Sequence, residues 1–419
     1  MIAYWEERKM RLKAQEYVDY YKKHIIEDCV PFWDRCIDEE CGGYFTCFDR
    51  EGNLTDSNKY VWFQGRQVYT YSLLYNRVEK RQDWLVKAYH GYKFLIKHCY
   101  AGKGRFNRIL TRRDEVIEGT IAIYADLHCI QGLAEFMLAT QCSIKEGMDI
   151  LNECYDTLEK NMFDPFFKDI FENTWSEKFI WHDMYLTALS VAEACAPVLG
   201  EDRTKKLIDE SLDKILNWFT RPEYEVVLEA ICRDNTPDLS EPDGRFVNPG
   251  HMTESMWFCL DTNRRLKNKS YEEKILKVID WAILKGYDEE YGGIYSFIDV
   301  NGGKAKEALD WYVECGCNWD DKVWWPNAEA LTCFAMAYAD TGIEKYGDVF
   351  ERQHNFCKDH FYDPEFGEWY SFLDRDGTCK IADKGSRWKC AFHVIRALVF
   401  TYEAMKRAAE REKVVELYK

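Results

Sequence analysis

The sequence predicts an all-α protein whose helices form an (α/α)6 barrel, with short β-hairpins in the loops between the helices. Two observations favour this fold. Long segments carry apolar residues at helical spacing and fall into an inner and an outer kind, and a hairpin motif recurs between them. No segment rich in Ser, Pro and Gly separates the chain into parts, so we expect a single domain over residues 1–419.

The helical segments differ in how far round the helix their apolar residues extend. Steps of four and three residues, the period of an α-helix, separate Ile123, Leu127, Ile130, Ala134 and Met137, and similar steps separate Met184, Ala188, Val191 and Cys195. Residues 328–339 are apolar almost all round, which predicts an inner helix covered on every side. Residues 205–219 are amphipathic, which predicts a helix of the outer layer.

A glycine-containing hairpin motif recurs along the chain at residues 41–52, 291–299 and 366–377. Each copy reads as a short alternating strand with a Gly or Asp-Gly turn. The spacing favours a unit of roughly 60–75 residues, two helices and a hairpin, that repeats about six times. Six such units predict a closed barrel with a pocket at one end, and an open helical solenoid is the alternative.

The composition excludes several classes of function. The formal net charge of −17 would repel a phosphate backbone, so nucleic acid is not expected as a partner. Aromatic residues make up 16% of the chain, and such rings form stacking surfaces in carbohydrate sites as well as ordinary core. GxGxxG, P-loop, GxSxG and HExxH motifs are absent, which removes the usual support for dinucleotide, kinase, serine-hydrolase and zinc-hydrolase chemistry.

The seventeen cysteines include no CxxC pair and no spacing typical of a metal site, so we expect free thiols, a reducing cytoplasm and no metal. Residues 1–21 are charged throughout and have no apolar signal core. No apolar run reaches the roughly 18 residues that a membrane span needs. The sequence therefore predicts a cytoplasmic protein without a membrane partner.

The first candidate catalytic residue is His251. Asn248 is a favoured N-cap and Pro249 suits the first position of a helix, so His251 is expected in the first turn. The positive end of the helix dipole there favours a neutral imidazole, as a general base needs. Glu254, on the same helical face, could orient this ring or relay its proton. The structural alternative is a histidine that only completes a helix end.

The second candidate is His393, in the apolar helical run 391–400 with Lys389 and Arg396 near it. Taken alone, such a histidine is more often a packing residue. Two imidazoles that face one substrate carbon from opposite sides can remove a proton from one face and return one to the other. The remaining histidines have no comparable setting and are interpreted as surface or packing residues: His24, His90, His98, His128, His182, His354 and His360.

Three further segments carry candidate substrate-binding residues. Arg66 follows Gly65 at a helix entry beside two aromatics and can reach a developing oxyanion, with ordinary ion pairing as the alternative. The segment 324–329 joins an aromatic floor, Trp325, to a carboxylate one turn on, Glu329. Tyr124 opens another inner helix, and core packing remains the alternative for both segments. Trp257 completes this set of candidates.

Taken together, these segments resemble the N-acylglucosamine 2-epimerase family, whose vertebrate members are also called renin-binding proteins. The resemblance runs nearly end to end and is carried by residues 42–47 (GGYFTC), 59–67 (KYVWFQGRQ), 248–254 (NPGHMTE), 324–329 (WWPNAE), 367–369 (GEW), 384–385 (KG) and 392–394 (FHV). It departs at Ile395, where the family usually has proline, and at Cys390-Ala391, where it often has Gly-Cys.

The resemblance implies an (α/α)6 barrel that interconverts N-acetyl-D-glucosamine and N-acetyl-D-mannosamine without a cofactor. His251 and His393 would be the acid–base pair, and pocket positions are matched by Arg66, Glu254, Trp325 and Glu329. It also implies ATP as a possible allosteric effector, and we expect a homodimer. The sequence leaves open a cellobiose 2-epimerase, a mannose-type aldose–ketose isomerase, a non-catalytic renin-binding-type protein, and a hydrolase that uses Asp126 and Glu329.

Overall fold

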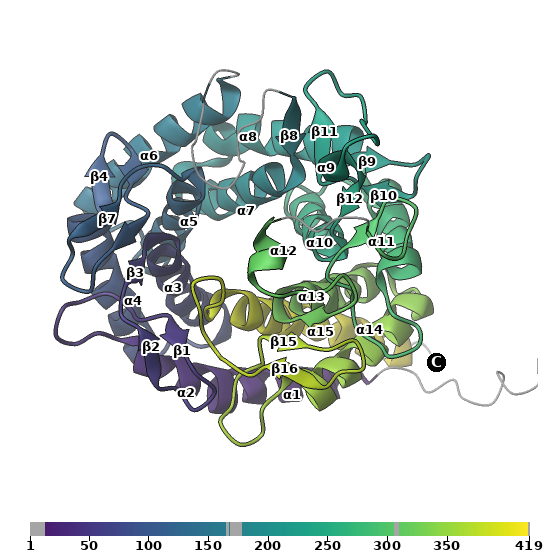
Figure 1. The fold of residues 1–419 in the computed structure, drawn as a ribbon. Helices are drawn as coiled ribbons and strands as arrows, with labels where there is room; N and C mark the ends of the chain where they lie inside the picture. The colour runs from purple at the N-terminus through teal and green to yellow at the C-terminus, as the bar shows by residue number, and fades with distance from the viewer. Residues whose placement is uncertain (1–12, 165–166, 168–177, 306–309, 418–419) are drawn as a thin grey trace, which may run out of the picture.

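A computed structural model describes residues 13–164, 167, 178–305 and 310–417, and its helices form two concentric layers (Figure 1). Within these residues the inner layer consists of α3 (Val61–Leu73), α5 (Ile123–Ala139), α7 (His182–Leu199), α10 (Pro249–Arg265), α13 (Trp324–Thr341) and α15 (Phe392–Leu417). The outer layer consists of α1 (Ala14–Lys23) with α2 (Val30–Trp33), α4 (Gln82–Phe94), α6 (Lys145–Phe163), α8 (Glu201–Asp213), α11 (Glu272–Gly286) and α14 (Glu344–Phe356).

The inner helices form a closed ring. α3 contacts α5, and contacts continue through α7, α10 and α13 to α15, which returns to α3. An open solenoid would leave its first and last repeats apart, so the predicted (α/α)6 barrel is confirmed and the solenoid is excluded. The prediction that residues 1–21 contain no signal core falls mostly on residues 1–12, which lie outside the described part of the chain. No helix in the described residues is long and apolar enough to cross a membrane.

Burial separates the two layers as the periodicity predicts. In α5 every residue except Leu138 is buried, and in α13 every residue except Asp340 and Thr341. The outer helix α8 buries one face only, made of Thr204, Leu207, Ile208, Ser211 and Leu212. Its sequence pattern continues past the α-helix into a π-helical turn, Lys214–Phe219. Inner helices therefore pack on all sides, and outer helices shield them from water.

Two glycines let the first inner helices approach closely. A Cβ atom at Gly65 of α3 would lie 2.5 Å from the backbone oxygen of His128, and one at Gly132 of α5 would lie 2.3 Å from the backbone oxygen of Gly65. No side chain larger than hydrogen fits at such distances. The contact brings Arg66, the residue after Gly65, beside His128 of the neighbouring helix.

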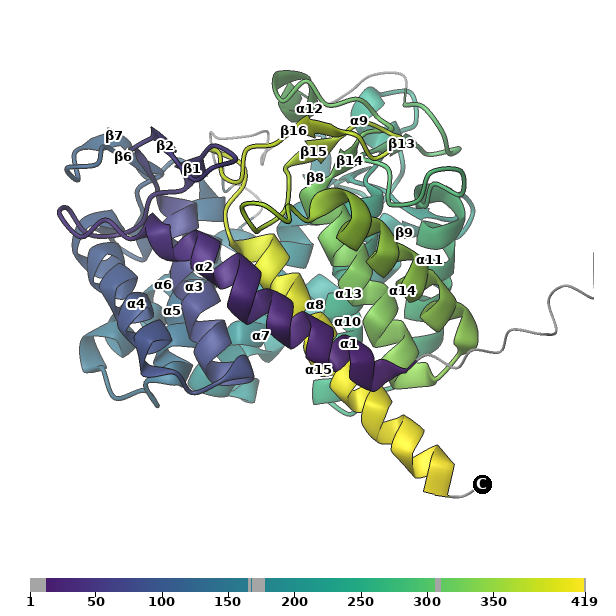
Figure 2. The same ribbon diagram turned by 90° about the horizontal axis from the view of Figure 1, so that it is seen from below.

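The strands are short and lie on the face of the barrel where the inner helices begin (Figure 2). Several lead directly into an inner helix, as β3 leads into α3 and β14 into α13. Two short helices, α9 (Pro242–Arg245) and α12 (Asp310–Glu314), lie in the loops of the same face. The strands are β1 (Cys47–Phe48), β2 (Leu54–Asp56), β3 (Lys59–Tyr60), β4 (Tyr100–Gly102), β5 (Arg105–Phe106), β6 (Ile109–Leu110), β7 (Val116–Glu118), β8 (Phe179–Trp181), β9 (Thr220–Arg221), β10 (Val226–Val227), β11 (Ala230–Cys232), β12 (Phe246–Val247), β13 (Ile298–Asp299), β14 (Lys322–Val323), β15 (Phe372–Leu373) and β16 (Cys379–Ile381).

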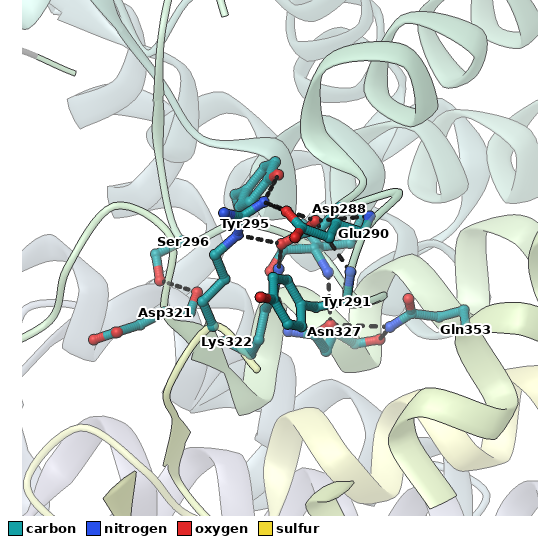
Figure 3. Close-up of polar contacts among 11 residues, drawn as sticks. Asp288, Glu290, Tyr291, Tyr295, Ser296, Asp321, Lys322, Asn327 and Gln353 are labelled. Atoms are coloured by element: carbon teal, nitrogen blue, oxygen red, sulfur yellow. Dashed lines mark hydrogen bonds and ion pairs between the residues drawn. The ribbon is translucent and has the colours of Figure 1, made fainter. Parts of the chain in front are cut away.

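The repeated hairpin motif is anchored by a buried ion pair, one copy of which appears in Figure 3. The Nζ atom of Lys322 lies 3.0 Å from Oδ2 of Asp288, and both side chains are almost completely buried. Nε of Arg375, from a later hairpin, lies 2.8 Å from the same carboxylate oxygen. Asn327 of α13 accepts a hydrogen bond from the backbone N–H of Ile294 at 2.8 Å. These contacts fix the turn after α11 to the start of α13.

The arrangement occurs three times in the described residues, and its last copy joins the two ends of the ring. The equivalent pairs are Lys59 with Asp38 at 2.9 Å and Lys384 with Asp363 at 3.0 Å. Nε of Arg50, from the first hairpin, lies 2.8 Å from Oδ2 of Asp363 in the last repeat. Because removing one member would leave a buried charge unpaired, these clusters hold the hairpin face in one geometry.

Candidate active site

A cavity of about 160 Å³ opens on the hairpin face, among the first turns of the inner helices. Five of the six inner helices contribute their second residue to the cavity wall: Trp62, Tyr124, Asp183, Trp325 and His393. His251 is the third residue of α10. Residues distant in sequence therefore meet because their helices begin on one face of the barrel.

His251 is held at both its backbone and its ring. The side chain of Asn248 accepts a hydrogen bond from the His251 backbone N–H at 3.2 Å, which confirms the predicted N-cap. Nδ1 of the ring lies 2.9 Å from Oε2 of Glu229, a buried residue between β10 and β11. A carboxylate only accepts hydrogen bonds, so Nδ1 carries the hydrogen and Nε2 is left for the cavity.

The charge on His251 differs from the one expected from the helix dipole. Burial by itself lowers the pKa of His251, but Glu229 raises it, with smaller contributions from Glu254 and Asp183, to about 9. Burial raises the pKa of Glu229, yet His251 and His182 together hold it at about 2. His251 is therefore an imidazolium at neutral pH, and the prediction of a neutral ring is wrong because a buried carboxylate outweighs a helix end.

His393 has the opposite charge state. Its Nδ1 lies 2.7 Å from Oε1 of Glu329, which is fully buried in α13. Burial lowers the pKa of His393 well below its usual value, and the positive charges of Arg66 and Arg396 lower it further, although Glu254 opposes them. His393 is neutral, with Nε2 free to accept a proton.

Trp325 lies close to both imidazole rings. Its centroid is 4.8 Å from that of His251 and 5.8 Å from that of His393. A Cβ atom at Gly250 would lie 2.8 Å from the Trp325 ring, so glycine is needed where the indole meets α10. The predicted aromatic floor therefore lies against both imidazoles.

Glu254 pairs with a different residue from the one predicted. It accepts a hydrogen bond from Arg396, not from His251, and Arg396 also lies 2.7 Å from Oε1 of Glu329. The ring nitrogen of Trp257 donates to Oε2 of Glu329 at 2.8 Å. Glu254 and Arg396 line the cavity, whereas Trp257 and Glu329 lie behind its wall and support His393. Trp257 and Glu329, which the sequence suggested as substrate-binding residues, are therefore in contact with His393 or its partner and are not among the residues that line the cavity.

Arg66 is a buried cation aimed at the cavity. Among the described residues it has no carboxylate partner within ion-pair distance, so the ordinary ion-pair alternative does not hold. Instead its Nη2 donates to Nε2 of His128 at 2.9 Å, and its guanidinium lies over the rings of Phe392 and Trp62. Burial lowers the pKa of Arg66 to about 10, which leaves it charged at neutral pH.

The remaining predicted residues divide between the wall and the core. Tyr124 lines the cavity and donates to Asp183 at 2.5 Å. Asp126 does not line it, because the backbone N–H of Phe106 and the side chain of Arg105 bind its carboxylate. The two-carboxylate hydrolase loses its support. Lys389, which the sequence placed near His393, pairs with Glu368 and donates to the backbone oxygen of Trp369.

Sequence reasoning missed Glu229, His128 and Asp183. His128 lines the cavity, which corrects its interpretation as a surface or packing residue. Glu229 belongs to no motif, but it is a lone acidic residue in the apolar run 226–231, where an unpaired charge would be costly. That pattern is the one signal that could have marked it.

Known proteins resemble this chain in sequence and in fold. The family model described as N-acylglucosamine 2-epimerase matches residues 43–397. The N-acylglucosamine 2-epimerase of Bos taurus is 30% identical over 95% of this chain and 94% of its own length. The cellobiose 2-epimerase of Dictyoglomus turgidum is 25% identical over 88% of this chain and 94% of its own.

A solved structure shows the same fold at lower identity. The cellobiose 2-epimerase of Bacillus thermoamylovorans superimposes with a TM-score of 0.80 and 19% identity, over 93% of this chain and 99% of that one. The family match covers most of the chain and includes both candidate histidines and the cavity that they line. The chain therefore belongs to the N-acylglucosamine 2-epimerase family and is an isomerase of the carbohydrate-epimerase type.

Proposed function

We propose that the protein interconverts N-acetyl-D-glucosamine and N-acetyl-D-mannosamine by moving a proton at C2 of the open-chain sugar. The observation that carries this proposal is the pair of imidazoles around Trp325, one neutral and one charged. In the open-chain form the aldehyde at C1 acidifies the C2 proton. A base on one face and an acid on the other are what inversion at C2 requires.

The protonation states suggest the order of events. Neutral His393 accepts the C2 proton at Nε2, while Glu329 at Nδ1 stabilises the imidazolium that forms. His251, already an imidazolium, donates its Nε2 proton to the opposite face of C2. His393 is then charged and His251 neutral, so exchange with water or a reverse turnover restores the starting state.

Arg66 stabilises the intermediate of this reaction. Loss of the C2 proton places negative charge on the C1 oxygen of an enolate, and a buried guanidinium without a carboxylate partner among the described residues is suited to it. General acid–base catalysis typically accelerates a reaction by ~10²–10⁴-fold. Stabilisation of the charged oxygen by Arg66 and positioning of the substrate contribute the rest of the rate acceleration. The scheme uses side chains alone and requires no cofactor.

Deuterium incorporation tests the proposal. The protein is incubated in deuterium oxide with N-acetylmannosamine, mannose or cellobiose, and C2 is followed by NMR. We expect deuterium at C2 of the N-acetyl sugar together with the 2-epimer. Exchange into cellobiose alone would support the activity that the Dictyoglomus turgidum relative is named for, and formation of a ketose would contradict epimerisation.

We further propose that the protein works in the cytoplasm as a homodimer, with ATP as a possible effector. The support is the family resemblance, together with seventeen cysteines that form no disulfide. Sedimentation of the purified protein, with and without ATP, tests assembly and nucleotide binding together.

A further inference from the structure

The cavity is deeper on one side of the barrel than on the other. On α5, α7 and α10 the first and last lining residues are seven residue steps apart, about 10 Å of helix at 1.5 Å per residue. On the other three inner helices they are at most four residue steps apart. The deep side is defined by the pairs Tyr124 and Gln131, Asp183 and Ser190, and His251 and Phe258. We call the region of the cavity below the histidines on this side the extension.

The extension has a mixed wall. Leu186 and Phe258 supply apolar surface, and Gln131, Thr187 and Ser190 supply neutral polar groups. His128 of α5 lies at the depth of Thr187, and its ring is neutral because burial and the charge of Arg66 lower its pKa. Among the described residues that line the cavity, Glu254 has the one carboxylate at the depth of Leu186, and it is already bound to Arg396. This composition suits a small neutral group that has both an apolar and a polar end.

One hydroxyl in the extension is oriented by its neighbour. Nε2 of Gln131 donates to Oγ of Ser190 at 2.7 Å. Ser190 therefore uses a lone pair toward Gln131 and keeps its hydrogen to donate, and no acceptor for that hydrogen is found among the described residues. A carbonyl oxygen entering the extension would complete this bond.

Substrate geometry distinguishes the groups that can enter. Both the C2 substituent and the C3–C6 chain start at the carbon between the imidazoles. The chain carries several hydroxyls, each of which needs partners when buried, whereas an N-acyl group carries one amide and a short apolar end. Toward the mouth, a second cavity of about 130 Å³ shares Trp62 and Tyr124 with the first. It offers the C3–C6 chain of the sugar an aromatic surface and contact with solvent.

Resting on the proposed function, we propose that the extension between α5, α7 and α10 is the subsite for the N-acyl group. Ser190 donates to the acyl carbonyl, and Leu186 and Phe258 contact the acyl methyl. These three are specificity-determining residues that select N-acyl sugars and limit the length of the acyl chain.

A series of N-acyl mannosamines tests this subsite. We expect the wild type to prefer N-acetyl over N-butanoyl mannosamine. Leu186→Ala and Phe258→Ala lengthen the extension and should raise the ratio of kcat/KM for N-butanoyl to N-acetyl substrate by about tenfold or more, since one methylene in an apolar pocket changes selectivity by roughly 10–200-fold. Ser190→Ala should lower kcat/KM for every N-acyl substrate by about tenfold.

Leu189→Ala is the matched control, because Leu189 is equally buried on α7 but does not line the cavity. Phe258→Leu replaces Phe258→Ala if the latter does not fold. Unchanged acyl-length ratios in active Leu186 and Phe258 variants, or an equal change in the control, would overturn the subsite. A wild type that exchanges deuterium into mannose but not into N-acetylmannosamine would instead show that the proposed function fails.

Discussion

The two halves of the cavity, around His251 and around His393, have the same local arrangement but opposite charge states. Both histidines lie in the first turn of an inner helix, bind a buried glutamate through Nδ1 and touch Trp325. Their other neighbours differ. Glu254 raises the pKa of both rings, but His251 also has Asp183 near it, whereas His393 has the cations Arg66 and Arg396.

The difference shows that a glutamate partner alone does not set the charge of a histidine. Around His251 carboxylates outweigh the cost of burial, and the pKa rises to about 9. Around His393 burial and the guanidinium charges together exceed the effect of the acidic groups, and the pKa falls. One site thus holds an acid and a base made from the same residue type.

Removal of either imidazole should have the largest effect. His251→Ala and His393→Ala should each reduce epimerisation by about 10²–10⁴-fold, since each removes one proton-transfer group. Each variant should still exchange C2 deuterium with only one of the two epimers, the one that faces the remaining base. NMR of both epimers in deuterium oxide measures this, and two variants with wild-type turnover would refute the two-base proposal.

Arg66→Met should have the next largest effect. We expect a loss of about 10²–10³-fold in kcat, typical of a missing oxyanion donor. Removing the nearby charge should also raise the pKa of His393, so activity should disappear at a higher pH on the acid side than in the wild type. Arg66→Lys keeps the charge and serves as the control, and an unshifted acid limb in Arg66→Met would argue against the electrostatic coupling.

Glu229→Gln should change the other half of the site. Without the carboxylate the pKa of His251 falls from about 9 toward its usual value. The alkaline limb of the pH–rate profile should therefore move down by about one unit or more. Glu223→Gln, at an exposed position near it in sequence, should leave the profile unchanged. Equal profiles for both variants would contradict the role of Glu229.

The smallest expected effect is on stability. Since the folded-state pKa of His251 is raised, the pair with Glu229 stabilises the protein fully below about pH 6.5, and this contribution is lost as the pH rises to about 9. We expect an extra loss of about 3 kcal/mol in the free energy of unfolding over that range. Urea unfolding of the wild type and His251→Gln at both pH values measures it, and parallel losses would exclude the linkage.

Local patterns predicted the fold, which the structure confirms, and singled out the two histidines that line the cavity. Apolar spacing on both layers, the repeated hairpin and the Asn248-Pro249 helix start are properties of short segments, and the structure contains each of them. The patterns failed where a partner comes from elsewhere in the chain. Glu254 was assigned to His251 because they share a helix face, yet it pairs with Arg396, which lies 142 residues away.

The sequence by itself determined the helices, their inner or outer place and the two histidines at helix starts, because periodicity and capping act within a few residues. Only the tertiary structure decided which histidine is charged. That outcome depends on Glu229 and Arg66, which the barrel brings to the cavity from different repeats. Electrostatic energies depend on distance in space and on burial, and separation along the chain determines neither.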